Sequence, residues 1–259
     1  RLADWMSALF PAPGLISRSI EYSLPYSLAD AATRVFSPYS YGPFYHNPLT
    51  GIVQAFHYDA VCAADAPRLF VCATNVRTGK VRVFSGHDIT TQAILASACL
   101  PTVFQAVEID DEAYWDGGYT GNPALFPLFE PDLPDDIVIV NINPLERDEI
   151  PKDAPAILNR INEISFNSSL LRELRAIGFV KRLIRDGQVK KGAMKDVKVH
   201  MIADDALMNE LGVGTKLVPS PAIILTLKDA GRAAADKFLS DHFEKLGKDS
   251  SVDLAEMVA

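Results

Sequence analysis

The feature that most constrains the fold is a run in the middle of the chain, Ile137-Val138-Ile139-Val140-Asn141-Ile142, in which every residue but Asn141 branches at Cβ. Side chains that branch at Cβ suit the pleated surface of a sheet, so this run favours a strand. A run without polar alternation is typical of a strand buried on both faces, as in the sheet of an α/β protein. Asn143-Pro144 ends it, because a residue before proline is restricted. We therefore expect an α/β fold around this strand.

Four other regions are predicted to be extended. Residues 68–73 and 81–84 flank Thr78-Gly79-Lys80 and predict a β-hairpin with its turn at the glycine. Residues 113–116 have strand composition and end at Asp116. Residues 198–203 alternate in polarity and predict one more strand, on which the lone His200 is expected to be structural.

Three helices are expected, two between these strands and one after the last of them. One covers residues 88–97 with Asp88 as its N-cap, and another opens at Asp229 and closes at Gly247. The longest follows Pro155 and closes near Gly187. Its buried face is expected to follow the spacing of three and four residues set by Ile157, Ile161, Ile164, Ser168, Leu171, Leu174 and Gly178.

Composition limits the class of protein. A chain of 259 residues with 48% hydrophobic residues can bury a large core, and no repeat or linker divides it. We expect a single α/β domain over residues 1–259, with a C-terminal helical extension at about 204–259. No apolar run approaches the roughly 18 residues of a membrane span. The formal charge of −8 and pI near 5.1 argue against a nucleic-acid partner, which needs a basic surface.

The cysteines and histidines give no metal-binding pattern. Cys62, Cys72 and Cys99 lie in apolar surroundings without ligand spacing, and we expect free, buried thiols. Free thiols fit a reducing compartment, so the expected location is the cytoplasm. No metal or organic cofactor is expected, since no second histidine lies at ligand spacing from His200.

The stretch with the most specific chemistry runs from Ala93 to Pro123 and centres on Asp116-Gly117-Gly118. Asp and Gly are common turn formers, so the tripeptide alone indicates no more than a turn after a strand. The glycines permit backbone conformations that residues with a Cβ resist. The carboxylate is therefore expected at a strand end, in a glycine-rich turn.

The surrounding pattern resembles the patatin-like phospholipase family. The pattern comprises Ala96-Ser97-x-x-Leu100-Pro101-x-x-Phe104, a short strand, and Tyr114-x-Asp116-Gly117-Gly118. It is similar to the C-terminal part of the domain in bacterial members of the family, and the resemblance covers essentially the whole chain. The resemblance implies a three-layer α/β/α fold with a central, mostly parallel sheet. It also implies a serine lipid acyl hydrolase with a Ser-Asp dyad, in which Asp116 is the base and Gly117 and Gly118 shape its turn.

One half of that dyad is not in this sequence. The family's serine lies in G-x-S-x-G on a strand-to-helix turn, and no such motif occurs here. Ser97 lacks these glycines and is expected to pack or to bond the preceding turn of its helix. Arg1 is neither an initiator Met nor part of a signal peptide, so we expect that an N-terminal portion with the nucleophile has been removed or is separate.

Two functions therefore remain open. The first is a phospholipase or esterase whose aspartate this chain supplies, so that the chain alone is expected to be inactive. The second is an interaction or regulatory module that kept the fold without the activity. The expected partners are an acyl lipid substrate, with peripheral membrane contact and a separate N-terminal fragment as further alternatives.

Two regions have competing interpretations. Residues 9–58 are rich in aromatics and proline, and they either line an acyl-chain pocket or lid or pack an irregular layer onto the core. Asn75, at the end of the first predicted strand, either bonds backbone near the site or caps the hairpin turn.

Overall fold

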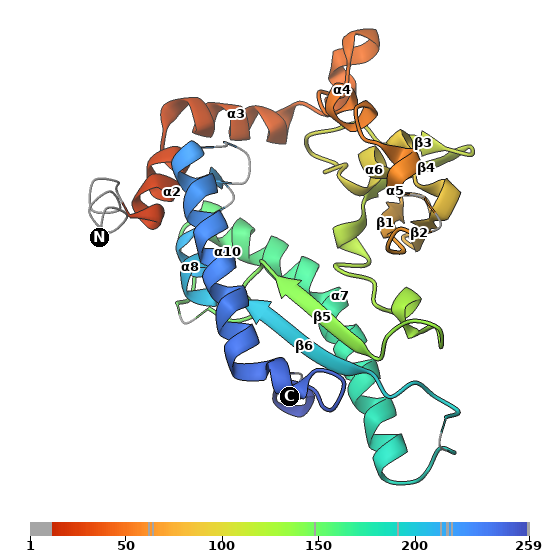
Figure 1. Cartoon of the computed structure of the whole chain (residues 1–259). Helices are drawn as coiled ribbons and strands as arrows, with labels where there is room; N and C mark the ends of the chain where they lie inside the picture. The colour runs from red at the N-terminus through yellow and green to blue at the C-terminus, as the bar shows by residue number, and fades with distance from the viewer. Residues whose placement is uncertain are drawn as a thin grey trace. The chain divides into compact units, whose positions relative to one another are not determined.

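The structure is a computed structural model that describes residues 12–257, apart from residues 62, 64, 148, 191, 213, 216, 217 and 219 (Figure 1). Expectations for Arg1 and Cys62 lie outside the described residues. The chain groups into two compact units. We call residues 30–127 and 168–173 the antiparallel unit, and the described residues up to 29, from 128 to 167 and from 174 onward the parallel unit. The single domain over residues 1–259 stays a prediction.

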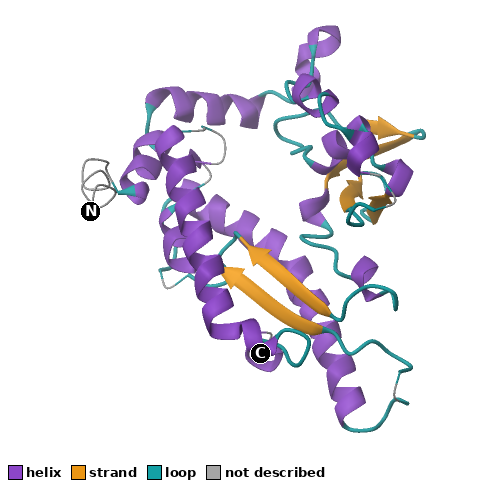
Figure 2. Cartoon of the chain, in the orientation of Figure 1, coloured by secondary structure: helices purple, strands orange, loops and turns teal. Residues whose placement is uncertain are grey.

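The antiparallel unit contains a four-stranded sheet in the order β2-β1-β4-β3 (Figure 2). Its strands are β1 (Phe70–Asn75), β2 (Val81–Ser85), β3 (Val107–Ile109) and β4 (Glu112–Asp116). Each strand pair is antiparallel, which confirms the predicted hairpin of β1 and β2. Its turn contains Gly79 with a φ of 65°. Asp110 and Asp111 join β3 to β4 with φ of 53° and 62°, as a type I′ turn requires at both central residues.

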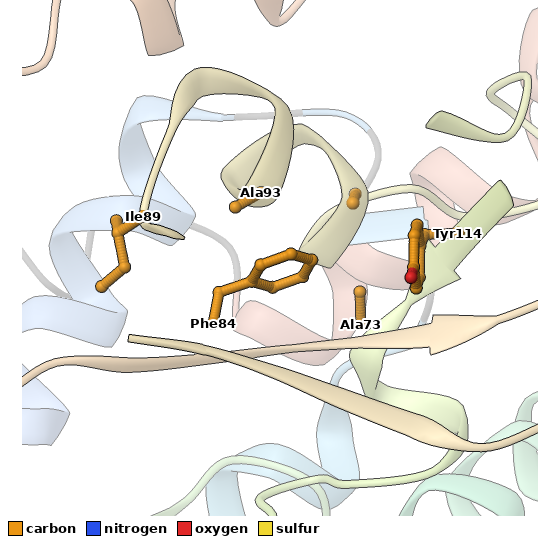
Figure 3. Close-up of a cluster of buried hydrophobic side chains, with 6 residues drawn as sticks. Ala73, Phe84, Ile89, Ala93 and Tyr114 are labelled. Atoms are coloured by element: carbon orange, nitrogen blue, oxygen red, sulfur yellow. The ribbon is translucent and has the colours of Figure 1, made fainter. Parts of the chain in front are cut away.

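The core of this unit lies between the sheet and helix α6 (Thr91–Ser97). Phe84 and Tyr114 make an edge-to-face contact with ring centroids 6.0 Å apart, a favoured geometry for aromatic pairs. Figure 3 shows the Phe84 side chain between the strands of the sheet and Ala93 of α6. The buried cluster consists of Ala73, Phe84, Ile89, Ala93, Ala96 and Tyr114.

Short helical segments make up much of the rest of residues 30–127. Prolines at positions 38, 43 and 48 interrupt regular structure, as expected from their composition. The segments before the sheet are α3 (Leu24–Val35), η1 (Pro38–Phe44), α4 (Thr50–Gln54) and α5 (Tyr58–Val61). Those after β2 are η2 (Gly86–Asp88), η3 (Gly117–Tyr119) and η4 (Phe126–Phe129).

The parallel unit contains β5 (Asp136–Asn141) and β6 (Lys198–Ala203), paired in parallel with Ile139 opposite Met201. Figure 1 shows α10 (Pro221–His242) running beside β6, and the two elements are in contact. Other helices of the unit are α2 (Pro13–Glu21), α7 (Ala154–Arg185), α8 (Asp205–Glu210), η5 (Phe243–Lys245) and α11 (Leu254–Met257).

The mixed α/β class is confirmed, but two details of the expected sheet differ. Parallel pairing joins β5 to β6, whereas the larger sheet is antiparallel, so a central, mostly parallel sheet is confirmed only in part. The prediction that β5 is buried on both faces is wrong for the described residues. Ile137 and Ile139 are buried, while Val138 and Val140 are 46% and 69% exposed.

Helix α7 is capped as its sequence predicts. The Asp153 carboxylate accepts a hydrogen bond from the N–H of Ala156, and Gly187 takes a φ of 69° beyond the last turn. The N–H groups of Gly187 and Gln188 donate to the carbonyls of Ile184 and Leu183, which is a Schellman ending.

The predicted buried face of α7 is confirmed in the middle of the helix but not near its start. Leu174 is fully buried, as are Leu170 and Ile177 nearby. Near the start of the helix, Ile161 and Ile164 are each 55% exposed, so the apolar row extends beyond the part that is covered.

Two predicted helix starts are displaced. Helix α10 begins at Pro221 rather than at Asp229, because proline is well tolerated in the first turn and the following residues continue the helical pattern. Helix α6 is capped by Thr90, whose hydroxyl accepts from the N–H of Ala93, and Asp88 lies in the 3-10 turn η2 instead.

Candidate active site

Asp116 is the last residue of β4, and its backbone is fixed from two sides. It lies opposite Ala73 of β1 in the antiparallel register. Its N–H donates to the carbonyl of Cys99 at 2.8 Å, and its own carbonyl accepts from the hydroxyl of Thr74 at 2.8 Å. The chain then enters η3, for which Asp116 is the N-cap. The carboxylate therefore lies at a strand end in a glycine turn, as predicted.

The Asp116 side chain uses one oxygen in this turn. Oδ1 accepts a hydrogen bond from the N–H of Gly118 at 2.7 Å, the usual contact of an N-cap side chain. Within the part of the chain that the structure describes, Oδ2 has no hydrogen-bond partner. The side chain is half-buried.

The environment of Asp116 makes its carboxylate a stronger base. Burial raises the pKa of Asp116 above its ordinary value, and the N–H of Gly118 opposes that rise. Of the described side chains, no cation lowers this pKa. A raised pKa brings the carboxylate closer to the range in which a general base works efficiently near neutral pH.

Two neighbours of Asp116 are held neutral. Burial, with a contribution from the Asp116 carboxylate, raises the pKa of the Cys99 thiol to about 11. Burial and the same carboxylate also raise the pKa of the Tyr119 hydroxyl. Cys99 donates its S–H to the carbonyl of Gln105 at 3.1 Å. A buried thiol of this kind is a poor nucleophile, because the thiolate is the reactive form.

The two glycines of the motif have different tasks. Gly117 is buried against β1, and a Cβ at this position would overlap the carbonyl oxygen of Cys72. Gly118 instead supplies the N–H that holds the Asp116 carboxylate. The packing gives Gly117 a steric reason to lack a side chain. That both glycines shape the turn for catalysis stays a prediction.

Sequence reasoning missed the hydroxyl pair that supports the turn. Thr74 Oγ1 lies 2.9 Å from Thr120 Oγ1 while donating to Asp116, so it connects both ends of η3 to β1. Thr74 is only 6% exposed. A threonine at the end of an otherwise apolar strand is the signal that points to such a bond.

Asn75, next to Thr74, caps the hairpin rather than the site. Its Oδ1 accepts from the N–H groups of Arg77 and Thr78 and from the hydroxyl of Thr78, and its Nδ2 donates to Glu112. The turn interpretation of Asn75 is confirmed.

Ser97 and His200, the other candidates from the sequence, have no hydrogen bond to Asp116 in the described part of the chain. Ser97 ends α6. His200 is fully buried in β6, with Nε2 2.9 Å from Oδ1 of Asp136. Among the described residues, no group of three or more His, Cys, Asp or Glu side chains could hold a metal ion. No described helix is long and apolar enough to cross a membrane.

An open apolar hollow of about 580 Å³ lies elsewhere in the antiparallel unit. Residues 55–57, 60–61 and 66–69 line it, and none of them belongs to the turn of Asp116. Arg68 contributes the one charged side chain of the lining, and its guanidinium carbon lies 5.4 Å from the centre of the Phe70 ring. The larger side chains around the hollow are Phe56, His57, Val61, Arg68 and Leu69.

One comparison with known families finds a match over part of the chain. Residues 22–129 match the family model described as patatin-like phospholipase. The matched range contains all four strands of the antiparallel sheet and the turn at Asp116. No curated protein matches the chain.

Proposed function

We infer that this chain, which is patatin-like over residues 22–129, is part of a lipid acyl hydrolase that uses a Ser-Asp dyad. Asp116 is the base of the dyad, and the serine comes from a segment outside these 259 residues. The substrates are carboxylic esters of phospholipids or related acyl lipids. The observation that carries the proposal is a half-buried carboxylate at a strand end with a raised pKa and one oxygen without a described partner.

The proposed reaction needs two residues because one carboxylate can serve both steps. The serine oxygen bonds to the ester carbonyl carbon while its proton passes to Asp116. The C–O bond to the leaving alcohol breaks, and that alcohol takes the proton from Asp116. In the second step, Asp116 accepts a proton from water, the hydroxide oxygen bonds to the acyl carbon, and the serine leaves with the proton. This route uses no metal or organic cofactor.

The experiment that tests the role of Asp116 is Asp116→Asn in the protein that includes the nucleophile segment. We expect normal folding and a loss of phosphatidylcholine hydrolysis of about 10²–10⁴-fold, the usual contribution of a general base. Asp111→Asn is the matched control, because Asp111 is an exposed residue of the β3–β4 turn and Asn also tolerates its positive φ. Unchanged turnover in Asp116→Asn would exclude the proposed role.

A second function is favoured by the absence of G-x-S-x-G from the 259 residues. On that account, the chain is an interaction or regulatory module with the fold but without hydrolysis. A fluorophosphonate probe separates the two. We expect no labelling of residues 1–259 alone, and labelling of a serine in a longer product or in a polypeptide that copurifies with the chain. If neither form can be labelled, the module is favoured.

A further inference from the structure

The sequence before the antiparallel sheet contains a long stretch without formal charge. No Asp, Glu, Lys or Arg occurs between Arg34 and Asp59, although such residues make up 22% of the whole chain. We call residues 36–56 the aromatic segment. It exposes large apolar side chains, of which Phe44 is the most exposed at 86%. The others are Phe36, Tyr39, Tyr41, Ile52 and Phe56.

Hydrogen bonds join the aromatic segment to residues 105 and 106. The hydroxyls of Tyr39 and Tyr45 accept from the backbone N–H groups of Ala106 and Gln105 at 3.0 and 3.2 Å. The Gln105 side-chain amide donates to the carbonyl of Pro38, which is itself buried. The ring of Tyr39 nevertheless remains 57% exposed. The segment therefore presents apolar rings to its surroundings, while the Tyr39 and Tyr45 hydroxyls and the Pro38 carbonyl are hydrogen-bonded within the protein.

The same contacts connect the aromatic segment to the turn of Asp116. Gln105 accepts the S–H bond of Cys99, and the carbonyl of Cys99 accepts from the N–H of Asp116. A continuous sequence of bonds thus runs from η1 through Gln105 and Cys99 to β4. These bonds therefore connect the segment, and any surface that it binds, to β4, the strand that positions the proposed base.

We propose that residues 36–56 bind the surface of a zwitterionic phospholipid assembly. Phe and Tyr rings are favoured at the boundary between water and hydrocarbon. Binding through anionic lipids would need Lys or Arg, and the segment has neither while the whole chain carries a charge of −8. The choice of a lipid partner rests on the proposed acyl-lipid hydrolase, whereas binding itself is independent of hydrolysis.

Cosedimentation with phosphatidylcholine vesicles tests the proposal. We expect the protein to bind, and Phe44→Ser to bind about tenfold more weakly, because an exposed phenylalanine that enters lipid contributes at least about 1.4 kcal/mol. Phe243→Ser is the matched control, since Phe243 is 61% exposed in η5 outside the segment. It should bind as the parent does. Anionic phosphatidylserine in the vesicles should not strengthen binding.

A second measurement follows insertion directly. Phe44→Trp places an indole at the most exposed position of the segment, and its emission should move to shorter wavelength and be quenched by brominated phosphatidylcholine. Absence of vesicle binding by the parent protein, or equal losses in Phe44→Ser and Phe243→Ser, would overturn the proposal. So would dimers in light scattering that Phe44→Ser dissociates, because a second copy would then cover the segment. If Asp116→Asn binds vesicles and hydrolyses lipid as the parent does, the proposed dyad is contradicted and the binding proposal is not.

Discussion

Gly117 lies so close to the carbonyl oxygen of Cys72 that a side chain at position 117 would overlap the backbone of β1. The two residues belong to segments that are far apart in sequence but packed together, since β1 pairs with β4 just before the turn. Backbone atoms of a central strand cannot move aside as the end of a flexible side chain can. The position of Asp116 therefore depends on the absence of a Cβ at the next residue.

Gly117→Ala is expected to destabilise the protein by about 1–3 kcal/mol, the usual cost of extra volume in a packed region. The measurement is urea unfolding followed by circular dichroism. Gly51→Ala in α4 is the matched control, because Gly51 has open space around its Cβ position. Alanine there should be neutral or stabilise by up to about 1 kcal/mol. Equal stability of the two variants would contradict the packing argument.

The Thr74 hydroxyl is expected to stabilise the turn through the Asp116 carbonyl. Thr74→Val keeps the shape of the side chain but leaves that carbonyl and the Thr120 hydroxyl without their partner, at a cost of about 1–3 kcal/mol. Thr74→Ser keeps the hydroxyl and loses one methyl group, at about 0.8 kcal/mol. Chemical denaturation of both variants checks the order. A serine variant less stable than the valine variant would show that packing outweighs the hydrogen bond.

Asp116 should also make stability depend on pH. Because burial raises its pKa in the folded state, the folded protein holds this proton more tightly than the unfolded chain, whose Asp pKa is about 3.9. This contribution is complete below about pH 3.9 and is lost as pH rises through the raised pKa. Asp116→Asn removes the ionisation, so its melting temperature should exceed that of the parent at pH 7, and the difference should shrink on acidification.

Asp241 provides a control of opposite sign for this pH dependence. The hydrogen bond from Lys237 lowers the pKa of the exposed Asp241 carboxyl, so its contribution is present at neutral pH and is lost on acidification. Asp241→Asn should therefore be slightly less stable than the parent at pH 7 and equal to it in acid. A melting temperature of Asp116→Asn below that of the parent at pH 7 would contradict the desolvation argument.

Local sequence signals predicted several elements well. The hairpin at Gly79, the strand that ends at Asp116 and the ending of α7 at Gly187 depend on nearest neighbours and on the special backbone freedom of glycine. The resemblance to patatin-like phospholipases agrees with the family match over residues 22–129. The Thr74–Asp116 bond was not predicted, since it joins residues whose proximity depends on strand pairing.

The sequence was a poorer guide to which apolar residues are covered. Val140 in β5 and Ile161 in α7 follow the patterns of buried residues, but burial depends on which other segments pack against them. The reverse holds for charged residues near the start of α7. Arg160 and Glu163 form an ion pair, and the Glu163 side chain is only 11% exposed.

Glu163 should contribute more to stability than a surface charge. Its two oxygens accept from Arg147 at 2.6 and 2.8 Å, and Arg160 adds a third contact. Burial alone would raise the pKa of Glu163, but the bonds and charges of the two arginines lower it overall. The stabilisation is therefore present above the unfolded pKa of about 4.3 and is lost as pH falls through the lowered folded pKa.

Glu163→Gln is expected to cost about 2–4 kcal/mol at pH 7, because Arg147 would keep its partly buried charge without a counterion. The difference from the parent should fall as the pH is lowered below about 4, where the parent also loses the carboxylate. Glu244→Gln is the matched control: Glu244 is 88% exposed beside Lys248, so the change should stay within about 0.5 kcal/mol. The measurement is the free energy of unfolding in urea for the parent and both variants, at pH 7 and in acid. Equal losses in Glu163→Gln and Glu244→Gln at pH 7 would mean that solvent screens the Arg147–Glu163 pair as it screens a surface ion pair.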